Sequence, residues 1–195
     1  MSVTKIEDYI VKLDRCMPES LCIELINEYG PSNLWEASKI EVGNAEKGVD
    51  VYASDDVRKC DRIPISVPEV LQESAKRKEL DQRVMTIVSS VFQTYYDKFK
   101  YAKCSRDTGY DLLRYDVGGK FTQHVDSTAR TPRILTIAFT LNDEFEGGEF
   151  AFFDRKLSYR LGVGDCLVFP SSFQYPHEVL PITKGRRYAL ITWMQ

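Results

Sequence analysis

Three patterns that would point to a membrane or a nucleic acid are missing from this 195-residue sequence. No segment approaches the roughly 18 to 20 apolar residues that a membrane-spanning helix needs. Residues 1–15 mix charged with apolar residues and so lack the apolar run of a signal peptide. The formal net charge is −3, so nucleic-acid binding would need a local basic patch. We therefore expect no membrane partner, and nucleic acid is disfavoured.

The cysteines also lack a pattern. They are odd in number, widely spaced and include no C-x-x-C pair, standing at Cys16, Cys22, Cys60, Cys104 and Cys166. A disulfide framework or a structural zinc site would require paired or closely spaced cysteines. The sequence therefore predicts free thiols and a cytoplasmic location.

Two segments in the first half of the chain carry helical patterns. Residues 18–29 begin with Pro18 and precede Gly30, the residue type that commonly follows a helix. Residues 67–100 place apolar side chains three and four positions apart, which predicts one amphipathic helix or two. Residues 43–65 fit an irregular connection with some strand. Their charged side chains fit a solvated loop, namely Asp50, Asp55, Asp56, Arg58 and Lys59.

The second half of the chain changes to a period of two. Short runs rich in β-branched and aromatic residues are bounded by Gly, Pro, Asp and Asn. Eight strands are predicted, at residues 110–115, 121–126, 134–141, 149–153, 157–161, 166–169, 177–180 and 188–194. Such a series of short strands predicts a double-stranded β-helix, or jelly roll, with the helices packed outside it.

The predicted fold class is thus mostly β with N-terminal helices around a jelly-roll core. A chain of this length with 43% hydrophobic residues can bury one core, so we expect a single domain over residues 1–195. Within it, residues 1–100 would supply helical support and substrate loops. Residues 101–195 would form the jelly-roll catalytic core.

The sequence has two histidines, and both stand beside turn signals in the β-rich half. His124 and Asp126 lie two positions apart in a predicted strand, so alternation directs both side chains to one face. His177 begins another predicted strand that could face the first in a closed double sheet. Two imidazoles and one carboxylate, with other coordination positions open, are the facial triad of non-haem Fe(II) oxygenases. An isolated H-x-D triplet often arises by chance, so the prediction needs further support.

Arg187 provides that support. If residues 181–185 form a turn, antiparallel pairing sets Arg187 near Val179, on the face that His177 occupies. An inward guanidinium could bind a carboxylate through two hydrogen bonds in an otherwise apolar interior. Because alternation lets only one of two neighbours point inward, Arg186 would then lie on the surface.

Five segments, in this order, resemble the prolyl 4-hydroxylase branch of the Fe(II)/2-oxoglutarate oxygenases, including its hypoxia-sensing members. They are LLRYDVGGKFTQHVD (112–126), RILTIAFTLN (133–142), GGEFAFF (147–153), GDCLVFP (164–170) and HEVLPITKGRRYALITW (177–193). The resemblance covers residues 110–194. It implies that His124, Asp126 and His177 bind iron and that Arg187 binds the distal carboxylate of 2-oxoglutarate.

The resemblance implies four further contacts. Tyr115 matches a tyrosine that lines the cosubstrate or substrate pocket. Thr140 stands where hypoxia-sensing members have a cosubstrate-binding tyrosine, so the side chain that makes this contact would be shorter here. Arg133 and Trp193 match positions near the target proline and are the candidate substrate contacts; Arg133 and Tyr115 are also candidate catalytic residues. In a second interpretation, Trp193 and Tyr115 simply fill space in the core.

The activity that the resemblance implies is hydroxylation of an unactivated C–H bond, foremost in a prolyl residue of a protein or peptide. Such a peptidyl-proline dioxygenase requires Fe(II), 2-oxoglutarate and dioxygen, with ascorbate as an optional addition. Asp126 favours hydroxylation over halogenation, because related halogenases replace this carboxylate with a small residue.

Three alternatives stay open. The substrate could be a free amino acid or another small metabolite. The chain could be a non-catalytic jelly-roll binding module, although such a module needs neither the three metal ligands nor an inward Arg187. A nucleic-acid demethylase would share the metal chemistry, but the acidic charge balance weighs against it.

Overall fold

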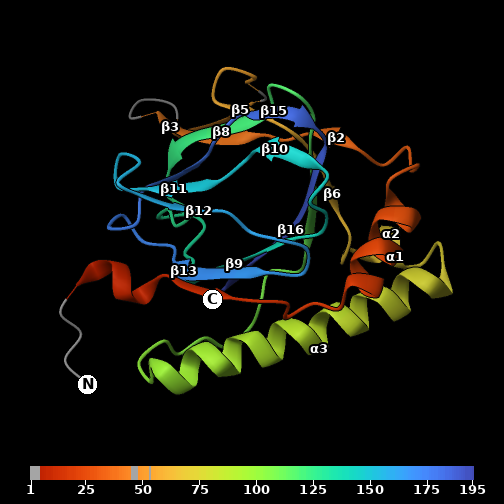
Figure 1. The fold of residues 1–195 in the computed structure, drawn as a ribbon, viewed down its shortest axis with the longest axis horizontal. Helices are drawn as coiled ribbons and strands as arrows, with labels where there is room; N and C mark the ends of the chain where they lie inside the picture. Colours follow the sequence, from red (N-terminus) through yellow and green to blue (C-terminus); the bar gives the residue numbers. More distant parts are fainter. Residues whose placement is uncertain (1–4, 45–47, 53) are drawn as a thin grey trace.

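The structure, a computed structural model, describes residues 5–44, 48–52 and 54–195, and the side chains of these residues outside 41–53. The expected absence of a signal peptide falls partly outside the described residues, at 1–4, and so does part of the expected 43–65 connection. Two β-sheets face each other, and the long helix α3 (Ala75–Lys98) runs along the outside of the larger one (Figure 1). None of the helices in the described ranges has the length and apolarity to cross a membrane.

The larger sheet has seven strands in the order β1-β13-β9-β16-β7-β6-β2, and every neighbouring pair is antiparallel. In chain order they are β1 (Val11–Leu13), β2 (Glu36–Ala37), β6 (Asp61–Pro64), β7 (Asp111–Tyr115), β9 (Leu135–Thr140), β13 (Cys166–Pro170) and β16 (Arg187–Met194). Strand β9, which lies inside the sheet between β13 and β16, is buried along its whole length, because helices cover one face of the sheet and the second sheet covers the other.

The smaller sheet has five antiparallel strands in the order β12-β11-β14-β8-β5. They are β5 (Arg58–Lys59), β8 (Lys120–His124), β11 (Phe150–Phe152), β12 (Leu157–Tyr159) and β14 (His177–Val179). Two further pairs lie apart from these sheets: β3 (Ile40–Asn44) with β4 (Gly48–Tyr52), and β10 (Phe145–Gly147) with β15 (Ile182–Gly185).

Two hydrophobic cores lie on opposite sides of the larger sheet. Helix α3 starts after Ser74, whose hydroxyl accepts hydrogen bonds from two backbone N–H groups of the first turn. Its buried residues recur every three or four positions and pack over the outward side chains of β9, which are Leu135, Ile137 and Phe139. Ala138, between them in sequence, belongs to the second core, which lies between the sheets. The remaining helices are α1 (Glu19–Tyr29), α2 (Pro68–Leu71) and the 3-10 helix η1 (Ile6–Tyr9).

Each segment predicted as helix or strand holds such an element, with three differences from expectation. Residues 181–185, expected as a turn, contain strand β15, and β10 was also not predicted. Because β15 pairs with β10, strands β14 and β16 are separated into opposite sheets, so the predicted pairing of Arg187 with Val179 is wrong. Arg187 instead pairs with Tyr115. The first hundred residues also supply strands β1, β2, β5 and β6 in addition to helices and loops.

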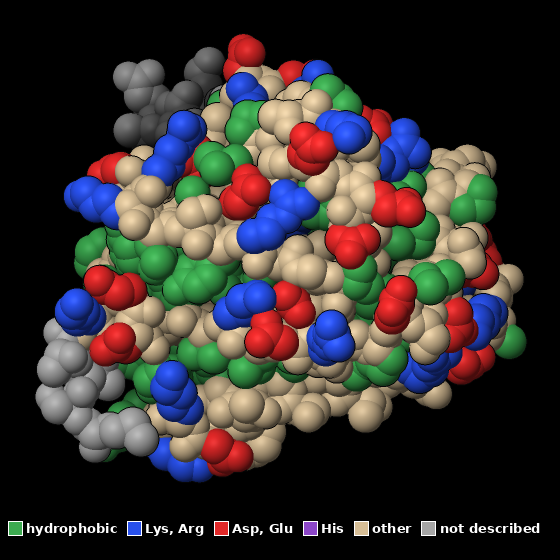
Figure 2. All heavy atoms as spheres, viewed as in Figure 1, with side chains coloured by type: hydrophobic (Ala, Val, Ile, Leu, Met, Phe, Trp, Pro, Cys, Tyr) green, Lys and Arg blue, Asp and Glu red, His purple; other side chains and the backbone are tan. Residues whose placement is uncertain are grey.

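The molecular surface gives no support to a nucleic-acid partner on the face that Figure 2 displays. Lys and Arg side chains there are interspersed with Asp and Glu side chains, so no broad basic field forms. All five cysteines are free, as their spacing predicts.

Candidate metal and cosubstrate site

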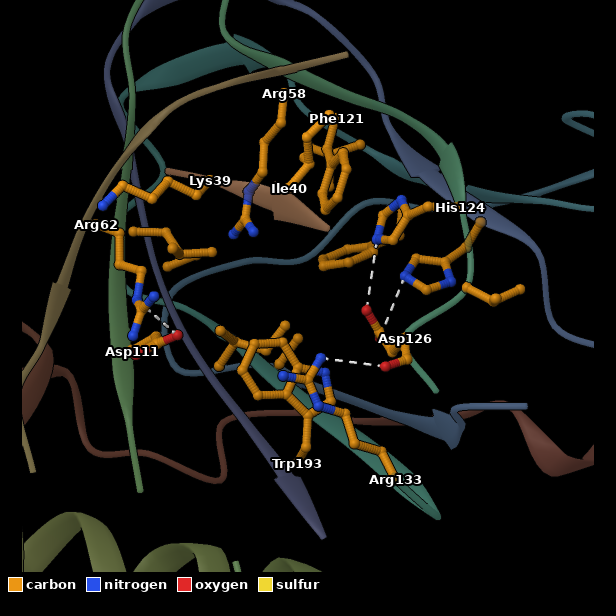
Figure 3. A pocket seen from close by; sticks show the side chains of 18 of the residues that line it. Lys39, Ile40, Arg58, Arg62, Asp111, Phe121, His124, Asp126, Arg133 and Trp193 are labelled. Carbon is orange, nitrogen blue, oxygen red and sulfur yellow. Dashed lines mark hydrogen bonds and ion pairs between the residues drawn. The ribbon is translucent and has the colours of Figure 1, made fainter. Parts of the chain in front are cut away.

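A cavity of about 450 Å³ lies between the two sheets. His124 and Asp126 lie on one side of it, and three cationic side chains, Lys39, Arg58 and Arg62, lie on the other (Figure 3). The buried guanidinium of Arg187 also faces this cavity. The predicted metal ligands and the predicted cosubstrate arginine therefore share one pocket, although they come from different sheets.

The three predicted metal ligands converge. One donor atom from each of His124, Asp126 and His177 lies within 4.8 Å of the others. His124 and His177 are direct partners in the β8–β14 pair, so both imidazoles project to the same side of the smaller sheet. Asp126 follows the end of β8, and its two carboxylate oxygens lie 3.5 Å from Nε2 of His124 and 3.4 Å from Nε2 of His177.

Backbone carbonyls fix the orientation of both imidazoles. Nδ1 of His124 lies 2.8 Å from the carbonyl oxygen of Thr122, and Nδ1 of His177 lies 3.0 Å from that of Tyr175. A carbonyl can only accept, so Nδ1 carries the proton in each ring and the Nε2 lone pairs point toward Asp126. Burial lowers the pKa of His177 to about 4, which keeps this ring neutral at physiological pH.

The donor set fits a divalent metal. Two Nε2 lone pairs and a carboxylate oppose one another without a proton between them, an arrangement that a bound cation would stabilise. Burial acts to raise the pKa of Asp126, but the positive charge that the imidazoles carry when protonated and the hydrogen bond from the hydroxyl of Thr136 outweigh it and lower that pKa; a cation bound at the two Nε2 atoms would act in the same direction. The carboxylate is therefore ionised and ready to bind iron.

Asp126 is held in place by two neighbours. Its Oδ2 accepts a hydrogen bond of 2.6 Å from the hydroxyl of Thr136, on strand β9. Its backbone carbonyl accepts one of 3.1 Å from Arg133. Contacts of this kind orient metal ligands and tune their basicity.

Arg187 is the largest of the nearly inaccessible side chains, at 1% exposure. Its Nη2 donates to the hydroxyl of Thr140 at 3.3 Å, and its guanidinium carbon lies 5.3 Å from the rings of Tyr115 and Phe150. Among the described residues it forms no ion pair, and its Nε has no hydrogen-bond partner. A buried cation without a counter-ion is unfavourable unless an anion joins it, so the site suits a carboxylate.

Gly148 makes room for this arginine. A Cβ at this position would lie 2.6 Å from Cδ1 of Ile182 and 3.1 Å from Cδ of Arg187, and the φ angle is +72°. A larger residue would therefore be strained and would press on the guanidinium stem.

The structure brings the four remaining predicted site residues to this region in different ways. Tyr115 is the direct strand partner of Arg187 and lines the cavity. Arg133 and Trp193 also line it, with the guanidinium carbon of Arg133 stacked 3.6 Å from the Trp193 ring. Thr140 contacts Arg187 and is not part of the cavity lining. Arg186 is exposed and pairs with Asp116, as alternation predicts.

The sequence interpretation missed the opposite wall. Arg58, expected in a solvated loop, is half-buried and lines the cavity, and Arg62 beside it pairs with Asp111 at 3.0 Å. One signal was present in the sequence: Arg58, Cys60 and Arg62 stand at every second position, so in an extended segment their side chains share one face. In the structure Cys60 packs into the core between the sheets. The charged residues Asp55, Asp56 and Lys59 are exposed as expected, while the side chain of Asp50 lies outside the described residues.

Comparison with known families identifies part of the chain. Residues 110–195 match the family model described as the 2OG-Fe(II) oxygenase superfamily. This match confirms the expected resemblance, and it contains the three metal ligands and Arg187. The wall formed by Lys39, Arg58 and Arg62 lies outside the matched segment.

Curated relatives match over the same part of the chain. The chain is 41% identical over 90 residues to a PKHD-type hydroxylase of Idiomarina loihiensis, a match that covers 43% of this chain. It is 34% identical over 92 residues to a PKHD-type hydroxylase of Delftia acidovorans, a match that covers 41% of this chain. Each match spans only 40% of the relative's own length.

Solved structures resemble almost the whole chain. A prolyl hydroxylase from Trichoplax adhaerens, in complex with a hypoxia inducible factor oxygen degradation domain peptide fragment, has a TM-score of 0.75 at 18% identity, covering 95% of this chain and 83% of that one. A Pseudomonas putida prolyl-4-hydroxylase has a TM-score of 0.65 at 17% identity, covering 96% and 92%. At these identities the likeness establishes a shared fold, which is the expected jelly roll.

Proposed function

Residues 110–195 of this chain match the 2OG-Fe(II) oxygenase superfamily. On this basis we propose that the protein is an Fe(II)- and 2-oxoglutarate-dependent dioxygenase that hydroxylates an unactivated C–H bond. The most direct substrate is a prolyl residue of a protein or peptide. The observation that carries the proposal is the placement, around one cavity, of three metal ligands and a buried arginine that forms no ion pair among the described residues.

The protein's own residues would hold and orient the reactants. His124, Asp126 and His177 would bind Fe(II) from one side and leave its other positions open, and Arg187 would bind the distal carboxylate of 2-oxoglutarate. Fe(II) with 2-oxoglutarate supplies the oxidising chemistry, in which dioxygen is consumed and succinate, carbon dioxide and a hydroxylated substrate form. The buried side chains between the sheets limit the access of water to this region.

Support for a prolyl substrate comes from the relatives and from the pocket. Prolyl hydroxylases share the fold, and one of them is described in complex with a peptide fragment. In this chain Arg133 and Trp193 form a stacked pair at the cavity wall, where the resemblance places contacts to the target proline. Arg133 and Tyr115 are the candidate catalytic residues; Tyr115 contacts Arg187 from the neighbouring strand β7.

A second candidate function keeps the same reaction and changes the substrate to a free amino acid or another small carboxylic acid. The observation that favours it is the cationic wall of Lys39, Arg58 and Arg62, which a neutral proline-rich peptide would not need. The five free thiols suit a reducing compartment, so a cytoplasmic location stays our prediction for either substrate.

The test begins without oxygen. Purified protein receives Fe(II) and then 2-oxoglutarate, and the visible charge-transfer band of an iron-chelated 2-oxo acid is recorded, with His177→Ala as the matched control. Oxygen is then admitted with a proline-rich peptide, with free L-proline or with neither. Band formation followed by faster decay and a mass gain of one oxygen on the peptide would support the full proposal.

Other results would redirect it. Decay accelerated by L-proline alone would favour the small-molecule candidate. If the wild-type protein gives no band, the dioxygenase proposal fails and a binding module becomes the better explanation.

A further inference from the structure

Arg58 occupies an unusual place beside the metal site. Strand β5 pairs with β8 so that Arg58 stands opposite Phe121. The guanidinium carbon of Arg58 lies 4.6 Å from the centre of the Phe121 ring, and that ring stacks on the imidazole of His124 at 3.4 Å with an angle of 16°. A single aromatic ring therefore separates this cation from a predicted iron ligand.

The guanidinium of Arg58 points into the cavity (Figure 3), where Asp111 interacts with it electrostatically without forming an ion pair among the described residues. Its Nε is buried without a hydrogen-bond partner, and no carboxylate of the described residues forms an ion pair with it. Asp111, an acidic side chain on this wall, pairs with Arg62 at 3.0 Å. Leaving a buried donor of a charged group unsatisfied is unfavourable, so this group is suited to binding an anion that enters the cavity.

Arg187 and Arg58 are two separate cations among the side chains that line the cavity. Arg187 is nearly inaccessible, at 1% exposure, whereas Arg58 is half-buried; the exposed Lys39 lines the same cavity. Tyr115 interacts electrostatically with both guanidinium groups. 2-Oxoglutarate has one distal carboxylate, which Arg187 would bind, so Arg58 would be free for a different molecule.

We propose that Arg58 binds a carboxylate of the substrate that is to be oxidised. This inference rests on the proposed function, because it takes the molecule on this wall to be the substrate. The carboxylate has two possible sources: the acidic side chain of a peptide residue next to the target, or the α-carboxylate of a free amino acid. Both present the same planar group that a guanidinium binds through two hydrogen bonds.

The experiment measures binding without turnover. Protein loaded with Mn(II) and 2-oxoglutarate is titrated anaerobically with two pairs of probes. One pair is a proline-containing peptide with Glu next to the proline and the same peptide with Gln. The other pair is L-proline and L-prolinamide. Dissociation constants are measured by isothermal titration calorimetry for the wild type and for Arg58→Gln, Arg58→Lys and Lys59→Gln.

We expect the wild type to bind the carboxylate member of at least one pair roughly tenfold or more tightly than its neutral partner. Arg58→Gln should remove this preference, and Arg58→Lys should keep a reduced part of it. Lys59→Gln removes the same charge from the neighbouring, exposed position of β5, so it should behave as the wild type. The pair that shows the preference identifies the source of the carboxylate.

Three results would overturn the proposal: equal affinity of the wild type for charged and neutral probes, failure of all four probes to bind, or an unchanged preference in Arg58→Gln. The first two results are measured on the wild-type protein, so the proposal can still be refuted if a variant fails to fold. Failure of the proposed function is recognised separately, by the missing charge-transfer band of the wild-type protein with Fe(II) and 2-oxoglutarate. In Arg58→Gln that band should form normally.

Discussion

The two ends of the cavity differ in how completely their polar groups are satisfied. At the metal end, both imidazoles are oriented by backbone carbonyls and Asp126 accepts a hydrogen bond from Thr136. At the Arg58 end, one aromatic ring away from His124, the Arg58 side chain projects into the cavity and its Nε has no hydrogen-bond partner among the described residues. The metal end is thus fixed by the protein itself, whereas the Arg58 end is completed by whatever binds there.

The two ends also come from different parts of the chain. The metal ligands and Arg187 lie within residues 110–195, which match the superfamily, and the cationic wall comes from residues before 65, which do not. Under the proposals above, the matched segment would hold the metal and the cosubstrate, and Arg58 from the earlier segment would add a contact to the substrate. Substitutions at one end should leave the function of the other end intact, and the following predictions test that independence.

The largest effect is expected from removing a metal ligand. His177→Ala or His124→Ala deletes one of three donors, so Fe(II)-dependent succinate formation should be abolished and metal affinity should fall by more than the roughly 100-fold typical of an outer contact. Equilibrium dialysis with Fe(II), together with circular dichroism to verify the fold, measures this. Arg58→Gln is the control and should keep the metal affinity of the wild type. Full activity in either histidine variant would refute the metal assignment.

Arg187→Met should have the next largest effect. It removes a buried charged partner of a carboxylate, a loss of about 2 to 5 kcal/mol, so the 2-oxoglutarate concentration needed for half-maximal rate should rise by at least about 30-fold. Iron affinity should change little. Arg186→Gln removes the neighbouring, exposed cation and should leave the requirement unchanged. If Arg186→Gln raised the requirement instead, Arg186 would be the cosubstrate ligand.

Thr136→Val tests the support behind the metal ligand. The substitution keeps the side-chain shape but removes the 2.6 Å hydrogen bond to Asp126, so metal affinity should fall roughly 10- to 100-fold. Thr136→Ser retains a hydroxyl and should recover most of the affinity. Equal affinities in the two variants would mean that this hydroxyl does not orient Asp126.

The smallest effect on the cavity is expected from the helix side of the larger sheet. Leu80→Ala on α3 removes a fully buried side chain and should lower the free energy of unfolding by about 2 to 5 kcal/mol, measured in urea. Metal and 2-oxoglutarate affinities of the folded protein should not change. Met85→Ala on the same helix, where Met85 is 50% exposed, should alter stability far less. A large loss of metal affinity in Leu80→Ala would show that the two cores are coupled.

The sequence predicted the metal end well because its signals are local. His124 and Asp126 are two positions apart in sequence, and alternation allows only one of Arg186 and Arg187 to point inward; the choice of Arg187 rested on the predicted strand pairing and on the resemblance. The strand partner of Arg187 was predicted wrongly, since the choice between Val179 and Tyr115 depends on the unpredicted β10–β15 pair.

The Arg58 wall was missed for a related reason. Strand β5 has two residues, and its place is determined by pairing with β8, more than fifty positions later in the chain. A charged residue in so short a strand gives the same local pattern as one in a solvated loop. Whether such a residue lies in a strand or in a loop depends on contacts with distant segments, and a single sequence gives little information about those contacts.

Strand β9 gives the site a fixed length. Thr136 holds Asp126 and Thr140 holds Arg187, and these threonines are four residues apart on one extended strand, a span of roughly 13 Å. A strand that is buried on both faces and paired on both sides cannot stretch or shorten. The backbone of β9 therefore sets the spacing between the metal ligand Asp126 and Arg187. A dicarboxylate that had to contact both a metal held by Asp126 and the guanidinium of Arg187 would therefore be selected by its length.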